Sequence, residues 1–248
     1  PVQLAEATVT VSASIGVSLY PDDNADADTL LRHADQAMYT AKDAGKNRYQ
    51  LFDPDSDRKA QFHRDYLIRL RAGLEREEFV LYYQPKVNMR TGKMIGVEAL
   101  IRWQHPTRGL LSPAAFLPII EDHPLAISLG EWVINAALTQ ISKWKALGLN
   151  VPVSVNVGAK QLQQGECIAC LRRLLQIHAD VDPSLLELEI LETSTLEDLI
   201  GVSNIIKECH SMGITFALDD FGTGYSSLTY LKKLPVTSLK IDQTFVHD

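Results

Sequence analysis

From Phe79 onward the chain repeats one pattern, in which a short apolar segment typical of a β-strand is followed by a longer segment with helical spacing. Strands that alternate with helices pair in parallel, because each helix returns the chain across a face of the sheet. The repeat therefore predicts a barrel or an open doubly wound sheet. The expected strands are Phe79 to Val87, Met94 to Arg102, Pro152 to Val157, Leu185 to Leu191, Ile214 to Asp220 and Val236 to Ile241, and the clearest helices are Leu125 to Leu147 and Leu196 to Met212.

Polar residues lie at or near the C-terminal ends of five of these strands. An open sheet binds its ligand in one crevice, whereas a barrel assembles its site from many strand ends. Five consecutive strands that deliver polar groups to the same end therefore favour an α/β fold of the TIM-like (β/α) barrel type. The residues are Glu98, Asn156, Glu189, Asp219 with Asp220, and Lys240, at successive separations of 58, 33, 30 and 21 residues.

These strand-end residues have the chemistry of a metal site. A carboxylate that ends an apolar strand is costly unless it faces water, a cation or a metal ion. Glutamate, asparagine and aspartate offer the oxygen ligands that Mg²⁺ or Mn²⁺ prefer, whereas zinc favours His and Cys. Asp219 and Asp220 are adjacent and can serve two metal ions, a pair that activates water in phosphodiester cleavage, and Lys240 can orient that water. Each acid taken alone is more simply explained as a helix cap or a solvated side chain, so the prediction depends on their convergence.

The first 52 residues predict a small α+β segment. Val9 to Tyr20 has the alternation of a strand closed by Pro21. Polar residues near Asp26 predict the start of a helix that Gly45 ends, and Asn47 to Phe52 predicts a closing strand.

A polar, turn-rich run, Asp53 to Asp57, then predicts a linker. Apolar residues at every fourth position after it predict an amphipathic helix that packs onto the second domain. These residues are Phe62, Tyr66, Leu70 and Leu74. We expect three parts: residues 1–52 as one segment, 53–64 as the linker with the start of the connecting helix, and 65–248 as the barrel domain.

Composition excludes several classes of function. Thirty-one acidic against 24 basic residues give a formal net charge of -7, which argues against binding DNA or RNA through a broad basic face. No apolar run reaches the roughly 20 residues that span a bilayer. We expect a cytoplasmic segment without membrane contact, whose parent protein could be anchored upstream of Pro1.

The Cys-x-x-Cys pair Cys167 and Cys170 favours ordinary helix packing over zinc.

Six motifs follow one another in order over about residues 65 to 248. They are Tyr83-Gln84-Pro85, Glu98-Ala99-Leu100-Ile101-Arg102-Trp103, Ser154-Val155-Asn156-Val157, Glu189-Ile190-Leu191-Glu192, the loop from Asp219 to Leu228, and Leu239-Lys240-Ile241-Asp242. Together they resemble the EAL-domain family of cyclic di-GMP phosphodiesterases. A bare Glu-Ala-Leu would occur by chance, whereas this ordered series would not.

The resemblance implies a role for each matched residue. Glu98, Asn156, Glu189 and Asp219 would be metal ligands, with Asp220 shared with a second metal or its water. Lys240 would assist the nucleophilic water, and Glu192 would hold the loop after Asp220 in its active shape. The catalytic set is thus Lys240, Asp220, Glu98 and Glu192, and the substrate-binding set is Gln84, Arg102, Leu100, Asp219, Phe221 and Gly222.

The family further implies hydrolysis of cyclic di-GMP to linear pGpG and a homodimer formed through the barrel. The leading segment resembles the C-terminal end of a GGDEF diguanylate cyclase domain. The matches are Ser14 to Ser18, Ala34 to Lys42 and Gly45 to Tyr49, whereas the Gly-Gly-Asp-Glu-Phe motif is absent from the sequence. We therefore expect no cyclase activity, and Lys42 and Lys46 on a solvated surface.

The family barrel has eight strands, whereas we count six here. We therefore expect a barrel truncated after its sixth strand, without two strand-helix units and their further glutamate and glutamine. Two alternatives to an active phosphodiesterase stay open: a non-catalytic cyclic di-GMP receptor or regulatory module, and an inactive fragment of the enzyme.

Overall fold

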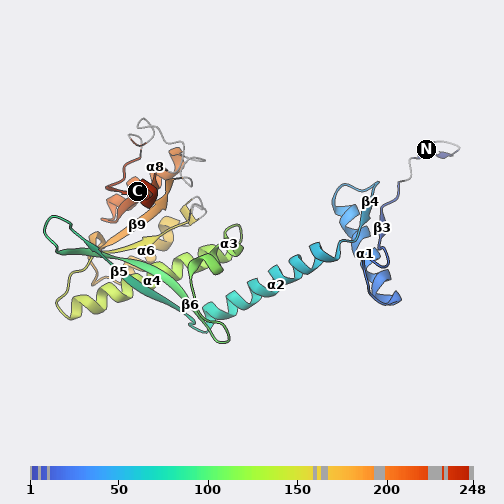
Figure 1. Ribbon diagram of the computed structural model, residues 1–248. Coiled ribbons are helices and arrows are strands. Elements are labelled where there is room, and N and C mark those ends of the chain that lie inside the picture. Colours follow the sequence, from blue (N-terminus) through green and yellow to red (C-terminus); the bar gives the residue numbers. More distant parts are fainter. Residues whose placement is uncertain are drawn as a thin grey trace. The chain divides into compact units, whose positions relative to one another are not determined.

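The computed structural model describes residues 2–4, 7–9, 12–158, 161–162, 167–192, 199–222, 231 and 234–245 (Figure 1). The chain divides into two compact units, residues 1–68 and 69–248. Among the described helices, none combines the length and the apolar character that crossing a membrane requires.

In the described part of the first unit, α1 (Ala27–Asp43) packs on a pair of parallel strands, a separate antiparallel pair is present, and the unit ends within α2 (Pro54–Glu75). A Cβ at Gly16 would lie 1.8 Å from the backbone oxygen of Ala34, so this glycine is what allows the helix to approach the strand. The elements are β1 (Val2–Leu4) paired with β2 (Ala7–Val9), β3 (Ile15–Val17) paired with β4 (Tyr49–Leu51), and α1 (Ala27–Asp43).

Both ends of α1 follow the prediction. The Asp26 side chain caps the helix by accepting a hydrogen bond from the Thr29 amide at 2.8 Å. Gly45 follows the last turn with φ +104°, a conformation that side chains disfavour. The predicted strand Val9 to Tyr20 is wrong in extent, because β4 offers only three residues to pair with, and these meet Ile15–Val17.

The expected linker Asp53 to Asp57 is also corrected, because α2 (Pro54–Glu75) begins inside it. Proline suits the first position of a helix, and acidic residues in the first turn complement its dipole. The Asp53 carboxylate accepts a hydrogen bond from the Asp55 amide at 3.0 Å. The polar run therefore starts a helix instead of a loop. Of the residues expected on its apolar face, Tyr66 and Leu70 are buried, and Phe62 is exposed.

The second unit is α/β, with one sheet whose strands run in the order β11-β10-β9-β8-β6-β5, and with β7 paired to β6. The pairs from β6 through β8, β9 and β10 to β11 are all parallel. The strands are β5 (Phe79–Val87), β6 (Met94–His105), β7 (Gly109–Leu111), β8 (Val153–Asn156), β9 (Leu186–Leu191), β10 (Thr215–Phe221) and β11 (Ser238–Ile241). The helices are α3 (Leu117–Ile120), α4 (Leu125–Ala146), α6 (Cys167–Ile177) and α8 (Leu199–Ser211), with short 3₁₀ turns at Pro113–Ala115, Pro183–Leu185 and Gln243–Phe245.

The strand β5 corrects the expectation of parallel pairing, because it runs antiparallel to β6. Only residues 88–93 join the two strands, and a parallel crossover needs a dozen or more residues. The Asn88 side chain accepts hydrogen bonds from the amides of Arg90 and Thr91, and Gly92 has φ +67°. This turn signal was present in the sequence. The predicted helix from Leu196 begins at Leu199 in the described part, since residues 196–198 lie outside it.

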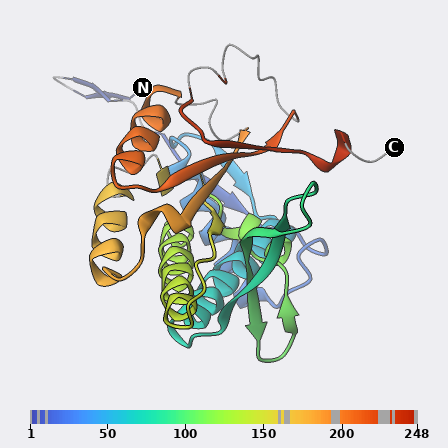
Figure 2. The same ribbon diagram turned by 90° about the vertical axis from the view of Figure 1, so that its left-hand side faces the viewer.

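Alternate residues along the parallel strands separate an apolar outer face from a polar inner face. Figure 2 shows α4, α6 and α8 side by side against the sheet. The strand residues that pack toward these helices are buried and apolar, and they include Val97, Ala99, Val153, Val155, Leu188, Ile190, Phe216 and Leu218. The intervening residues, which point the other way, include Glu98, Ser154, Asn156, Glu187, Glu189, Asp219, Ser238 and Lys240.

The sheet curls around this polar face. The Lys240 Nζ on β11 lies 3.1 Å from Glu98 Oε2 on β6, although three strands separate these two in the sheet. In a flat sheet four strand spacings would hold them roughly 19 Å apart. The polar residues therefore line the inside of a curled sheet, which agrees with the predicted barrel type.

Candidate active site

Four strands bring oxygen ligands to one rim of the barrel. Glu98, Glu189 and Asp219 each place a carboxylate oxygen within 4.8 Å of the others. Asn156 joins them by donating from Nδ2 to Glu98 Oε1 at 2.9 Å. The convergence that the sequence pattern predicts is therefore present.

Lys240 lies at the centre of these carboxylates. Its Nζ donates to Glu189 Oε2 at 2.6 Å, to Asp219 Oδ2 at 2.8 Å and to Glu98 Oε2 at 3.1 Å. Burial alone would lower the pKa of Lys240, but the hydrogen bonds to Asp219 and Glu189 outweigh it and raise the pKa. The lysine is therefore an ammonium ion at neutral pH.

Glu189 is the most enclosed of the acids, with no exposed side-chain surface. Burial raises its pKa above the ordinary value, because the opposing hydrogen bond from Lys240 does not fully compensate. Additional positive charge beside a buried carboxylate of this kind stabilises its ionised form.

Asp220 occupies a special backbone position directly after Asp219. Its φ is +53°, in the left-handed region, and its amide donates to Asp219 Oδ1 at 2.9 Å. Burial and the neighbouring charges of Asp219 and Asp242 raise the pKa of Asp220. Strained backbone of this type is found at functional sites.

Glu192 holds the chain just beyond Asp220. Its carboxylate is fully buried and accepts a hydrogen bond from the Gly222 amide at 2.7 Å. Gly222 has φ +103°, and a Cβ there would lie 2.6 Å from the Phe245 ring, so glycine is required. Residues 223–228 of the predicted loop motif lie outside the described part.

Of the residues predicted to meet a substrate, Gln84 lies on β5, Leu100 and Arg102 lie on β6, and Asp219 and Phe221 lie on β10, directly before Gly222. Gln84 pairs directly with Glu98 across the two strands. The Arg102 guanidinium lies 5.8 Å from the centre of the Tyr82 ring, and its Nη1 donates to the Ile101 carbonyl at 2.8 Å. These contacts hold Arg102 against the strand.

A cavity of about 790 Å³ opens beside the acidic rim. Leu100 and Asn156 belong to its wall, which connects it to the strand ends. Its other lining residues are mainly apolar: Ala99, Ile101 and Leu191, together with residues between 113 and 133 and between 157 and 161. The volume is in the range of small-molecule sites.

The sequence of residues 68–248 matches the family profile described as EAL domain. The chain belongs to the EAL domain family. Residues 1–48 match the profile described as diguanylate cyclase, GGDEF domain.

Individual relatives share these domains with the chain. It is 42% identical over its whole length to the bifunctional diguanylate cyclase/cyclic di-GMP phosphodiesterase MucR of Pseudomonas aeruginosa, covering 36% of that protein. It is 36% identical to the cyclic di-GMP phosphodiesterase PdeR of Escherichia coli, again over its whole length, covering 37% of that protein. The chain thus spans about a third of these curated relatives.

Solved structures agree with this assignment. The MucR phosphodiesterase in complex with c-di-GMP superposes with a TM-score of 0.70 at 42% identity, covering 74% of this chain and 76% of that one. The structure of the EAL enzyme Bd1971 in its cGMP-bound form gives a TM-score of 0.69 at 32% identity, over 77% of this chain and 53% of that one.

The acidic rim of this EAL domain fits a divalent metal ion by its donor chemistry. The carboxylates of Glu98, Glu189 and Asp219 share the Lys240 ammonium group, so negative charge at the rim is in excess. Their oxygens and that of Asn156 are hard ligands arranged around one small region. The predicted ligand set is thus suited to such an ion.

Sequence reasoning missed a second lysine inside the EAL domain. Lys86 on β5 contacts Ser154, Glu187 and Glu189. The signal was its position two residues after Gln84, which places both side chains on one face of a strand. The position of Lys86 below the rim could not be predicted without knowing that β5 runs antiparallel to β6.

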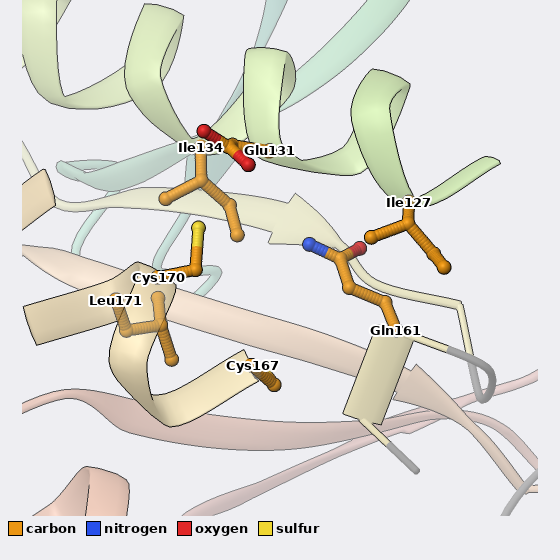
Figure 3. Close-up of a pocket in the computed structure, with 7 residues that line it drawn as sticks. All are labelled: Ile127, Glu131, Ile134, Gln161, Cys167, Cys170 and Leu171. Carbon is orange, nitrogen blue, oxygen red and sulfur yellow. The ribbon is translucent and has the colours of Figure 1, made fainter. Parts of the chain in front are cut away.

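The cysteine pair of the EAL domain is packed between helices, as predicted. Cys167 and Cys170 on α6 border a cavity of about 50 Å³ beside α4, and Figure 3 shows the Cys170 sulfur directed toward Ile134. Burial raises the pKa of the Cys167 thiol to about 11, and burial together with Glu131 raises that of Cys170. Protonated thiols are poor zinc ligands.

In the GGDEF-like segment, Lys42 and Lys46 are both exposed. The Lys42 ammonium lies 4.8 Å from the centre of the Tyr39 ring. Their side chains are therefore on the surface, as expected.

Proposed function

We propose that this EAL domain hydrolyses cyclic di-GMP to linear pGpG with the help of Mg²⁺ or Mn²⁺. One observation carries the proposal: carboxylates and an amide from four strands meet around Lys240 at the rim of a curled sheet. The similarity to two cyclic di-GMP phosphodiesterases, MucR and PdeR, supplies the substrate.

The proposed metal ligands are Glu98, Asn156, Glu189 and Asp219, with Asp220 shared by a second ion or its water. Two bound ions would lower the pKa of a water and balance charge on the leaving oxygen. The chain's own residues supply the geometry, because each ligand comes from a different rigid strand. Glu192 would keep Asp220 in place through its hydrogen bond to Gly222.

The substrate would lie across the 790 Å³ cavity with a phosphodiester at the rim. Arg102 presents a guanidinium that suits a phosphate, and Gln84 lies beside Glu98. Leu100, Phe221 and Gly222 would border the substrate. Lys240 carries a positive charge at this point, which orients the attacking water and offsets negative charge as the phosphorus is attacked.

The proposal extends to the oligomeric state, the location and the partners of the chain. We infer that it acts as a homodimer through the EAL domain, in the cytoplasm. The net charge of -7 makes DNA, RNA and anionic membranes poor partners. An anionic dinucleotide is accepted only where local cations bind it.

The decisive experiment incubates the chain with cyclic di-GMP and Mn²⁺ or Mg²⁺ and follows products by chromatography. Glu98→Ala removes one proposed ligand, and Glu208→Ala, at an exposed surface pair with Arg172, is the matched control. We expect metal-dependent pGpG from the chain and from Glu208→Ala, and a loss of about 100-fold or more from Glu98→Ala.

Other outcomes separate the alternatives. Binding of cyclic di-GMP without turnover, unchanged in Glu98→Ala, would identify a receptor instead of an enzyme. Neither binding nor turnover would identify an inactive fragment.

A further inference from the structure

Below the acidic rim, a second cation lies inside the barrel. Because β5 runs antiparallel to β6, the residues that follow Gln84 go deeper into the barrel, away from the rim. Lys86 therefore reaches the level of Ser154 and Glu187, each of which precedes a rim residue by two positions. Its side chain is about 29% exposed.

Lys86 belongs to a closed network of hydrogen bonds. Its Nζ donates to Glu187 Oε2 at 2.7 Å and to Ser154 Oγ. Glu187 also accepts from Ser154 Oγ at 2.6 Å and from Ser238 Oγ at 2.9 Å. Both oxygens of Glu187 are thus satisfied, and the network joins β5, β8, β9 and β11 in one layer.

This layer contacts the rim through Glu189. Lys86 Nζ lies 3.4 Å from Glu189 Oε1, while Lys240 Nζ lies 2.6 Å from Glu189 Oε2. Each oxygen of this buried carboxylate is therefore in contact with a different ammonium group. A carboxylate that is fixed at one oxygen presents the other in a constant direction.

We propose that Lys86 is a positioning residue that fixes Glu189 so that Oε2 points to the metal site at the rim. The inference rests on the proposed function, since it concerns a ligand of the proposed ions. Lys86 itself does not line the 790 Å³ cavity. It acts through Glu189, and the rest of the network holds Lys86 in turn.

A simpler role is that Lys86 and Glu187 form a structural ion pair only. Lys86→Met alone cannot distinguish the two, because it leaves Glu187 without its cation and adds net negative charge near the rim. The double variant Lys86→Met with Glu187→Gln removes one charge of each sign. The glutamine keeps one acceptor oxygen for either Ser154 or Ser238, its amide nitrogen can donate to the hydroxyl of the other serine, and the variant deletes the contact with Glu189.

The test measures Mn²⁺ binding to the full chain by calorimetry without substrate, and kcat and KM with cyclic di-GMP. The double variant should bind Mn²⁺ about 10-fold more weakly or worse, with lower kcat at a fixed Mn²⁺ concentration and unchanged KM. Lys86→Arg, which keeps the charge and donors, should retain most of the affinity. Arg173→Met with Glu131→Gln, a surface pair, is the charge-neutral control and should match the unmodified chain.

Folding is checked by thermal unfolding without metal. Lys86→Gln with Glu187→Gln keeps polar groups at both positions and serves if the methionine variant does not fold. The shorter glutamine does not reach Glu189, so the same loss of Mn²⁺ affinity is expected. A double variant that binds Mn²⁺ like the unmodified chain, whatever its unfolding temperature, overturns the positioning role and leaves the proposed function intact. Failure of the unmodified chain to bind Mn²⁺ or to make pGpG overturns both.

Discussion

At the scale of single residues, charge organises the rim: the Lys240 ammonium group donates to three carboxylates that would otherwise repel one another. Strand-end position and side-chain chemistry are both visible in the sequence, and they were enough to predict this convergence. Glu98, Asn156, Glu189, Asp219 and Lys240 all converge as expected. Their roles in binding metal and in catalysis stay predictions. The contact of Lys86 with Glu189 was not predictable, because it depends on the direction of β5 and on the curl of the sheet.

Lys240 is predicted to stabilise the fold as well as to serve the reaction. Lys240→Met leaves the carboxylates of Glu98, Glu189 and Asp219 facing one another without that ammonium group. In metal-free buffer at pH 7 the free energy of unfolding should fall by about 3 kcal/mol. Mn²⁺ should then raise the unfolding temperature of the variant, since bound cations stabilise the folded state. An unfolding temperature equal to that of the unmodified chain would show that the cluster does not need this charge.

At the scale of elements, periodicity predicted the parallel strands and the long helices of the EAL domain close to their observed bounds. The predictions that were wrong concern the connections between these elements. The six-residue turn after β5 and the proline that starts α2 were both visible in the sequence. The surrounding pattern nevertheless predicted parallel pairing at the first place and a linker at the second. Short connections decide strand direction, because the chain has no length in which to cross the sheet.

The anchor of α2 to the barrel predicts a pH dependence of stability. Glu78 Oε2 accepts from Arg69 Nη2 on α2 at 2.6 Å and from Trp103 Nε1 on β6 at 3.0 Å. Burial raises the pKa of Glu78, but the hydrogen bonds from Trp103 and Arg69 outweigh burial and hold the pKa below its usual value. A lowered pKa means that the ionised group stabilises the fold above the unfolded-state pKa of about 4.3, and that this stabilisation is lost as pH falls through the lower folded-state value.

Glu78→Gln should therefore cost about 1 to 3 kcal/mol at pH 7 and less at pH 3. Urea unfolding of both proteins at the two pH values measures this difference. A cost that does not shrink on acidification would contradict the assigned ion pair.

At the scale of the whole molecule, the chain consists of a GGDEF-like segment followed by an EAL domain, whose curled sheet brings acidic side chains together at one rim. The apolar outer face packs against helices and fixes the strands, and the polar inner face carries the proposed chemistry. The sequence alone could predict this division, because alternation along a strand assigns each side chain to one face. It could not predict how the polar layers contact one another inside the curled sheet.

The most direct measurement is anomalous X-ray scattering from crystals of the chain grown with Mn²⁺. We expect an anomalous peak bounded by Glu98, Asn156, Glu189 and Asp219, and its loss in Glu98→Ala crystals. Well-ordered crystals in which these four side chains converge but hold no Mn²⁺ at saturating concentration, or in which they point apart, would contradict it.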